Sequence, residues 1–236
     1  MFPMSRIRLI RGFCSLVKPK QDFVYFHNKE VWPQKFIDDI MTNCFVSPDF
    51  ITEKEEEDLM KEITPHMKRL KYERHHWDDA IYLFREREQR NWNEDNSKII
   101  QRIIDNSIPK ESKHLSYIHI LDLHKDGYIR PHIDSVRYCG NIVTGVSLLS
   151  DSVMRLVNED KTLIFDLFLQ RRSLYKLSGA GRYNFTHEIL PKDKSRFRGH
   201  HIFRDRRISV ICRDLPKKDS HVEERTINDI KFQPLD

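Results

Sequence analysis

A histidine and an aspartate stand two residues apart near the middle of the chain, in the stretch GYIRPHIDSVRYCG (residues 127–140). Side chains alternate between the two faces of a strand, so His132 and Asp134 are predicted to share one face while Ile133 occupies the other. Such a pair can chelate a metal ion if a third ligand converges on it. Without a third ligand, the pair is an ordinary polar strand end.

A third ligand has to come from the remaining histidines. His187 is the best candidate because it lies in RYNFTHEIL, a strand pattern that places Tyr183, Phe185 and His187 on one face. Five more histidines lie in a charged upstream segment, a basic loop and the C-terminal tail (His75, His76, His200, His201 and His221). Two imidazoles and one carboxylate on one face of an octahedral ion leave positions open for a co-substrate and O₂, as in non-haem Fe(II) enzymes. Spacing alone indicates such a site only weakly.

Two arginines near the C-terminal end of the chain strengthen the hypothesis. In RRISVICR, Arg207, Ser209, Ile211 and Arg213 alternate onto one face of a strand. Inward-facing arginines are costly to bury unless they meet anions, and guanidinium binds carboxylate in a bidentate fork. A dicarboxylate such as 2-oxoglutarate fits this pattern. The alternative is a pair of strand-end arginines that reach solvent or bridge Asp205 and Asp214.

The elements that would position these residues fall into two halves. The first half is predicted to be helical: FITEKEEEDLMKEITPHMKRL (residues 50–70) begins with Thr52 as N-cap, and Pro65 should kink or shorten this helix. NSKIIQRIIDNSIP (residues 96–109) has the isoleucine spacing of a second helix buried on one side. From residue 114 onward, seven short apolar runs separated by turn residues predict strands of an antiparallel barrel or sandwich. The expected class is α+β with a mainly β core flanked by N-terminal helices.

Charge and composition restrict the partners. Five of the 41 Lys and Arg residues lie in residues 1–20 without any acid, so the remaining 36 balance the 36 acidic residues. Net charge therefore gives little support to nucleic-acid binding. The basic, amphipathic residues 1–20 are typical of a mitochondrial transit peptide, the alternative being a disordered basic tail. No run of apolar residues is long enough for a membrane span, the four cysteines form no metal or disulfide motif, and residues 216–236 are expected to be a polar tail.

Taken together, H-I-D, F-T-H and R-x-x-x-x-x-R in this order resemble the AlkB family of Fe(II)- and 2-oxoglutarate-dependent dioxygenases, over roughly residues 45–215. The resemblance implies a double-stranded β-helix of the jelly-roll or cupin type, with iron bound by His132, Asp134 and His187. It also implies that Arg207 holds the distal carboxylate of 2-oxoglutarate and that Arg213 lies near its chelating end. Tyr175, in SLYKLSG, resembles a further co-substrate contact, although a core tyrosine is an equal alternative.

The chain also departs from the family pattern. Nucleic-acid repair members carry Asn-x-Tyr on the strand before H-x-D, where Leu121, Asp122 and Leu123 stand here. No hairpin resembling a nucleotide-recognition lid is found, so double-stranded DNA is not an expected substrate. Tyr175 is a plausible replacement for part of the usual co-substrate contact.

One interpretation is a dioxygenase of the mitochondrial matrix that hydroxylates a protein, because an open site with a short lid could admit a loop of a protein substrate. A mitochondrial member of the family is linked to programmed necrosis and fatty-acid metabolism. One alternative is demethylation of mitochondrial RNA, for which aromatic side chains could stack on bases unless they serve only packing (Trp77, Tyr82, Phe84 and Trp92). The chain could instead be a non-catalytic scaffold that binds a partner, or a small-molecule oxygenase with a closed apolar pocket over the iron.

Overall fold

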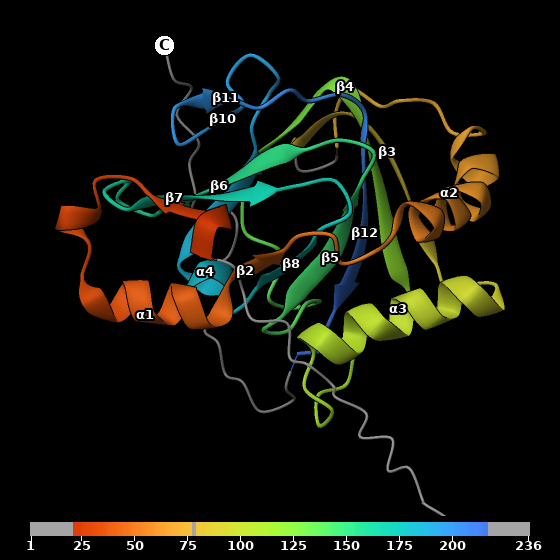
Figure 1. Cartoon of the computed structure of the whole chain (residues 1–236), viewed down its shortest axis with the longest axis horizontal. Helices are drawn as coiled ribbons and strands as arrows, with labels where there is room; N and C mark the ends of the chain where they lie inside the picture. The colour runs from red at the N-terminus through yellow and green to blue at the C-terminus, as the bar shows by residue number, and fades with distance from the viewer. Residues whose placement is uncertain (1–20, 77–78, 217–236) are drawn as a thin grey trace, which may run out of the picture.

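The computed structural model describes residues 21–76 and 79–216. The predicted transit peptide, Cys14, Trp77, His221 and all of the predicted tail beyond residue 216 lie outside these ranges. Within them, the chain forms a large antiparallel sheet that curls into a barrel-like core, with the longer helices on its outside (Figure 1). Cys44, Cys139 and Cys212 are buried free thiols, which agrees with the absence of a disulfide motif in the sequence.

The sheet is built from ten strands in the order β1-β7-β6-β9-β4-β12-β5-β8-β2, with β3 paired to β4 off this path. All of its pairs are antiparallel. The strands are β1 (Val24–Phe26), β2 (Phe45–Ser47), β3 (Ile81–Gln89), β4 (Ile118–His132), β5 (Val143–Leu148), β6 (Ser152–Asn158), β7 (Ile164–Leu169), β8 (Leu174–Leu177), β9 (Phe185–Ile189) and β12 (Arg207–Arg213). A separate hairpin joins β10 (Arg196–Phe197) and β11 (His200–His201).

The seven predicted strands are confirmed as β4 to β9 and β12. The first half contains the two predicted helices, but the prediction missed three strands that also come from it, β1, β2 and β3. In addition, Tyr183 belongs to the short helix α4 (Gly179–Tyr183) and not to β9, so it does not share a strand face with His187.

The two predicted helices are present with altered ends, as α2 (Glu53–Met67) and α3 (Glu94–Ser107). The helix α1 (Gln34–Asn43) and the 3₁₀ turns η1 (Gln21–Phe23) and η2 (Lys29–Val31) were not predicted. Thr52 caps α2 through a capping box with Glu55, as its position predicts. Pro65 lies inside α2, which ends two residues later at Met67, so Leu70 is not part of the helix. Proline removes the helical hydrogen bond to the carbonyl of residue 61, so Pro65 weakens the last turns of α2.

Hydrophobic clusters cover the two faces of the sheet. One contains Ile208, Val210 and Cys212 of β12 and packs against the isoleucines of α3. The other contains Leu121 and Ile211 and fills the opposite, inner face. β12 therefore alternates as predicted, with Arg207 and Arg213 on the same face as Ile211. The fold aims both arginines toward the interior of the barrel.

Candidate metal centre

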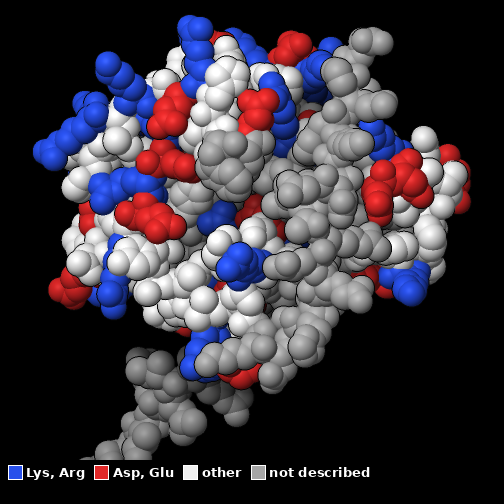
Figure 2. Space-filling view, turned by 180° about the vertical axis from the view of Figure 1, so that it is seen from behind, with Lys and Arg blue, Asp and Glu red and all other residues white. Residues whose placement is uncertain are grey.

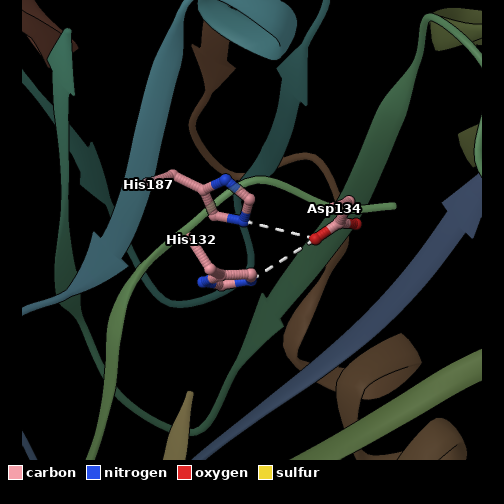
Figure 3. A group of neighbouring side chains, drawn as sticks. All are labelled: His132, Asp134 and His187. Atoms are coloured by element: carbon pink, nitrogen blue, oxygen red, sulfur yellow. Dashed lines mark ion pairs between the residues drawn. The ribbon is translucent and has the colours of Figure 1, made fainter. Parts of the chain in front are cut away.

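Three potential metal ligands converge at the end of β4. His132 is the last residue of β4 and lies opposite His187 of β9 in the antiparallel pair. One ligand atom from each of His132, Asp134 and His187 lies within 4.8 Å of the others. Oδ1 of Asp134 is 3.4 Å from Nε2 of His132 and 3.6 Å from Nε2 of His187, and Figure 3 shows both imidazole rings directed toward this carboxylate. Because β4 ends before Asp134, a loop positions the carboxylate, where the sequence predicted strand alternation.

The protonation of these groups suits a divalent cation. Nδ1 of His132 lies 2.9 Å from the carbonyl oxygen of Arg130. A carbonyl only accepts, so Nδ1 carries the proton and Nε2 presents its lone pair to the site. Burial, followed by the neighbouring His132, lowers the pKa of His187 to about 3, so this imidazole is neutral at physiological pH. Two neutral nitrogens and one carboxylate oxygen are the donor set of non-haem Fe(II) sites.

Arg213 fixes the orientation of the Asp134 carboxylate. Its Nε donates to Oδ2 of Asp134 at 3.0 Å, which leaves Oδ1 facing the two histidines. Burial alone would raise the pKa of Asp134. The Arg213 guanidinium and the His132 contact outweigh burial and hold this pKa well below its usual value. Asp134 is therefore a charged carboxylate with one oxygen directed at the two histidines, as a metal ligand requires.

Arg207 forms the second cationic group on the inner face. It is 2% exposed and donates from Nε to Oγ of Ser147 at 2.9 Å, while its Nη2 is buried without a partner. Burial lowers the pKa of Arg207, and the neighbouring Tyr175 acts against this. Within the described part of the chain, neither Arg207 nor Arg213 pairs with Asp205 or Asp214, so the alternative derived from the sequence is not realised. A buried guanidinium with an orphaned donor fits a carboxylate ligand.

Tyr175 lies at 3% exposure in the inner cluster and also faces Arg207. Core packing and a co-substrate contact, the two alternatives for this residue, are thus compatible. Leu121 and Leu123 join the same cluster, where repair members of the resembled family carry polar side chains. Asp122 points to the other face, where its carboxylate accepts hydrogen bonds from Arg85, Arg206 and Tyr72. Tyr175 and Ser147 are the neutral polar groups beside Arg207.

Comparison with known proteins identifies the family of this chain. The chain is 45% identical to the mouse (Mus musculus) protein named alpha-ketoglutarate-dependent dioxygenase alkB homolog 7, mitochondrial, and 46% identical to its Bos taurus counterpart. Each match spans 173 residues, 73% of this chain and 78% of the relative. The chain belongs to the AlkB family of 2-oxoglutarate-dependent dioxygenases. (Alpha-ketoglutarate is 2-oxoglutarate.) No protein-family model matches the chain.

Solved structures support the same fold. The structure of OsALKBH1 superposes with a TM-score of 0.53 at 10% identity, covering 72% of this chain and 97% of that one. A Pseudomonas putida prolyl-4-hydroxylase superposes with a TM-score of 0.52 at 13% identity, covering 77% and 97%. These likenesses confirm the predicted jelly-roll core flanked by helices. Among the described residues, no helix combines the length and the apolar character needed to cross a membrane.

Two further polar side chains near the candidate site, Arg182 and His119, were not predicted from the sequence. Arg182 of α4 is buried, donates weakly to the carbonyl of Cys139, and contributes to the low pKa of His187. Nothing in its local sequence distinguishes it from an exposed arginine. His119 lies two residues before Leu121 on β4 and contacts Arg213. Strand alternation in HILDL could have placed His119 on the inner face.

The neutral state of His187 predicts that acid destabilises the metal-free dioxygenase. The unfolded chain protonates this histidine near pH 6.5, whereas the folded protein does so only near pH 3. Unfolding therefore takes up a proton, and the free energy of unfolding should fall by up to about 1.4 kcal/mol per pH unit below pH 6.5. Urea titrations with a chelator between pH 7 and 4.5 measure this. His187→Gln should show a correspondingly shallower dependence, and equal slopes would contradict the assignment.

Proposed function

We propose that this chain is an Fe(II)- and 2-oxoglutarate-dependent dioxygenase of the mitochondrial matrix that hydroxylates a protein side chain. Iron would be held by His132, Asp134 and His187, and the distal carboxylate of 2-oxoglutarate by Arg207 with Tyr175. Arg213 would lie near the chelating end of the co-substrate. The observation that carries the proposal is the convergence of the three ligand atoms within 4.8 Å on the face that also holds the orphaned Arg207 donor.

The bound groups would supply the oxidising chemistry, and the side chains would bind and orient these groups. Iron and 2-oxoglutarate, when bound, supply the oxidising chemistry, in which O₂ converts 2-oxoglutarate to succinate and CO₂ while a C–H bond of the substrate is hydroxylated. The protein keeps its histidine ligands unprotonated, holds the Asp134 carboxylate in one orientation and offers fixed cations to the co-substrate. Fixed charges of this kind need no rearrangement when the co-substrate arrives.

A protein substrate is supported by an accessible metal face. The His132 side chain is 23% exposed, so the site is not sealed in the way a small-molecule oxygenase with a closed apolar pocket would require. Tyr138, four residues beyond Asp134, is 65% exposed and offers an aromatic surface to a polypeptide. Among the described residues visible in Figure 2, basic and acidic side chains are interspersed without an extended cationic stripe. Such a stripe is the usual signature of nucleic-acid binding.

RNA demethylation would need exposed aromatic side chains that stack on bases, and the structure buries some of the candidates. Phe84 is 1% exposed in the inner cluster, and Trp92 packs against the outer one, so neither can act as a stacking platform. Tyr82 stacks on Tyr128, with ring centroids 5.2 Å apart. One relative, the Caenorhabditis elegans protein named DNA N6-methyl adenine demethylase, is 30% identical over 114 residues, which is 35% of its length. The experiment below therefore also examines RNA as a substrate.

The matrix location is proposed because both mammalian relatives are named mitochondrial. The family resemblance further leads us to propose a role in programmed necrosis and fatty-acid metabolism. If the location is right, the tagged full-length chain should resist added protease in intact mitochondria and in mitochondria whose outer membrane is ruptured. Degradation after rupture of the outer membrane alone would place the protein outside the matrix.

The test of the function combines turnover with a search for products. Purified protein with Fe(II) should convert 2-oxoglutarate to succinate, and this conversion should disappear in His132→Ala. Mitochondrial protein and RNA, treated with either enzyme, are then compared by mass spectrometry. Protein that gains oxygen with the wild type and not with His132→Ala supports the proposal. If RNA loses methyl groups and no protein gains oxygen, the protein is an RNA demethylase instead. Equal turnover by both enzymes would remove the metal assignment, and turnover by neither would favour a scaffold.

A further inference from the structure

A line of polar contacts continues from Arg213 away from the metal position. Nη1 of Arg213 lies 3.1 Å from Nδ1 of His119, and Nε2 of His119 lies 2.9 Å from Oε2 of Glu86. Oε1 of Glu86 in turn lies 3.3 Å from Nε2 of His76. The four side chains come from three neighbouring strands, β12, β4 and β3, and the loop before β3. The contacts thus join the carboxylate ligand Asp134 to a second carboxylate on β3.

Strand register makes this line possible. His119 is opposite Ile211 of β12 on one side and opposite Glu88 of β3 on the other. Opposed residues share a face, so His119 lies on the inner face with Ile211 and Leu121. Arg213 and Glu86 are each two residues from the partners of His119 and are therefore its diagonal neighbours. Long polar side chains reach across such diagonals.

The chemistry of the donors fixes the direction of each hydrogen bond. Guanidinium has donors only, so Nδ1 of His119 must accept from Arg213. A neutral imidazole that accepts at Nδ1 carries its proton on Nε2, and this proton points at Glu86. Burial would raise the pKa of Glu86, but the hydrogen bond from His119 and the proximity of His76 outweigh burial and lower it, which keeps the acceptor ionised. A proton on Nδ1 would bring two donors together at Arg213, and an unprotonated Nε2 would bring two acceptors together at Glu86.

We propose that His119 and Glu86 are positioning residues that hold Arg213 in the orientation that directs Asp134 toward the metal and presents the guanidinium to the co-substrate. The inference rests on the proposed function, because it gives Asp134 and Arg213 their roles there. Glu86 fixes the tautomer of His119, His119 fixes Arg213, and Arg213 occupies Oδ2 of Asp134 so that Oδ1 stays with the histidines. Partners that orient a metal ligand in this way affect metal affinity or activity by about 10- to 100-fold.

The test measures binding of Mn²⁺ alone to the full chain by electron paramagnetic resonance, followed by kcat and KM for 2-oxoglutarate. His119→Leu and Glu86→Leu should each weaken Mn²⁺ binding about tenfold and raise KM by a larger factor than they lower kcat. Glu86→Gln keeps an acceptor for Nε2–H and should stay within about threefold of the wild type. His27→Leu is the matched control, because His27 pairs with Asp166 at 2.7 Å on another part of the sheet. It should leave both measurements unchanged.

Nitrogen-15 NMR of the metal-free wild type gives an independent readout that needs no variant to fold. In the wild type, His119 should show a protonated Nε2 and an unprotonated Nδ1; in a folded Glu86→Leu, the population of this tautomer should also fall. A protonated Nδ1 in the wild type, or unchanged Mn²⁺ binding in a folded His119→Leu, would overturn the inference. His132→Ala separates the two proposals. If it keeps Mn²⁺ binding, the metal site itself is misassigned; if it alone loses binding, only the positioning role fails.

Discussion

Asp134→Ala is expected to retain less than about a thousandth of the wild-type rate of 2-oxoglutarate turnover, as loss of an essential group in a catalytic unit commonly causes. Two effects coincide in this variant. The metal position loses its charged ligand, and Arg213 loses the carboxylate that orients its guanidinium at 3.0 Å. The measurement is succinate formation at saturating Fe(II) and 2-oxoglutarate, where weakened co-substrate binding alone would not lower the rate.

Stability has to be followed in the same variant. Removing one partner of a buried ion pair leaves an uncompensated charge and costs about 3–5 kcal/mol. The Asp134 and Arg213 side chains are 10% and 17% exposed, so this cost applies here with some solvent screening. Asp134→Asn is the matched control, because its amide oxygen can still accept from Arg213 while the ligand charge is lost. A folded Asp134→Asn with wild-type turnover would contradict the assignment of Asp134 as a metal ligand.

The sequence predicted the parts of this fold that depend on local alternation. In β12, Ile208, Val210 and Cys212 join the outer cluster, while Arg207 and Arg213 share the inner face with Ile211, because side chains of a strand alternate strictly. β3 was missed for the opposite reason: five of its nine residues, REREQ, are charged or polar and lack an apolar face of their own. Pairing with β4 makes this segment a strand, and a single sequence does not show that pairing.

The site was predictable in its residue types and not in its contacts. His132 and His187 are 55 positions apart, yet the register of β4 and β9 sets them opposite each other. Neither the hydrogen bond from Arg213 to Asp134 nor that from Arg213 to His119 has a local signal, because their partners are 79 and 94 residues apart. Tertiary structure also decides which arginines are buried, which is why Arg182 passed unnoticed in the sequence.

Arg207→Met is expected to stabilise the protein in the absence of 2-oxoglutarate. It is also expected to weaken the binding of 2-oxoglutarate strongly. Arg207 is a fully buried cation whose Nη2 has no partner, a condition that costs folding free energy until an anion arrives. A buried donor left without a partner costs about 1–3 kcal/mol, so an apolar side chain of similar size should stabilise the protein by about this amount. The variant also lacks the buried guanidinium that would pair with the carboxylate of 2-oxoglutarate. The KM for 2-oxoglutarate should therefore rise by a factor of about 30 or more. Opposite signs of the two effects identify a residue kept for binding at the expense of stability.

The measurement is a pair of thermal unfolding curves for each protein, with and without 2-oxoglutarate and Mn²⁺. The wild type should gain stability on adding the co-substrate, because a ligand that binds only the folded state shifts unfolding by mass action. Arg207→Met should start higher and gain almost nothing. Arg207→Lys is the control: it keeps a buried charge without the planar fork, so it should bring no stabilisation and an intermediate KM. A destabilised Arg207→Met that still responds to 2-oxoglutarate would show instead that Arg207 serves the fold through Ser147 and Tyr175.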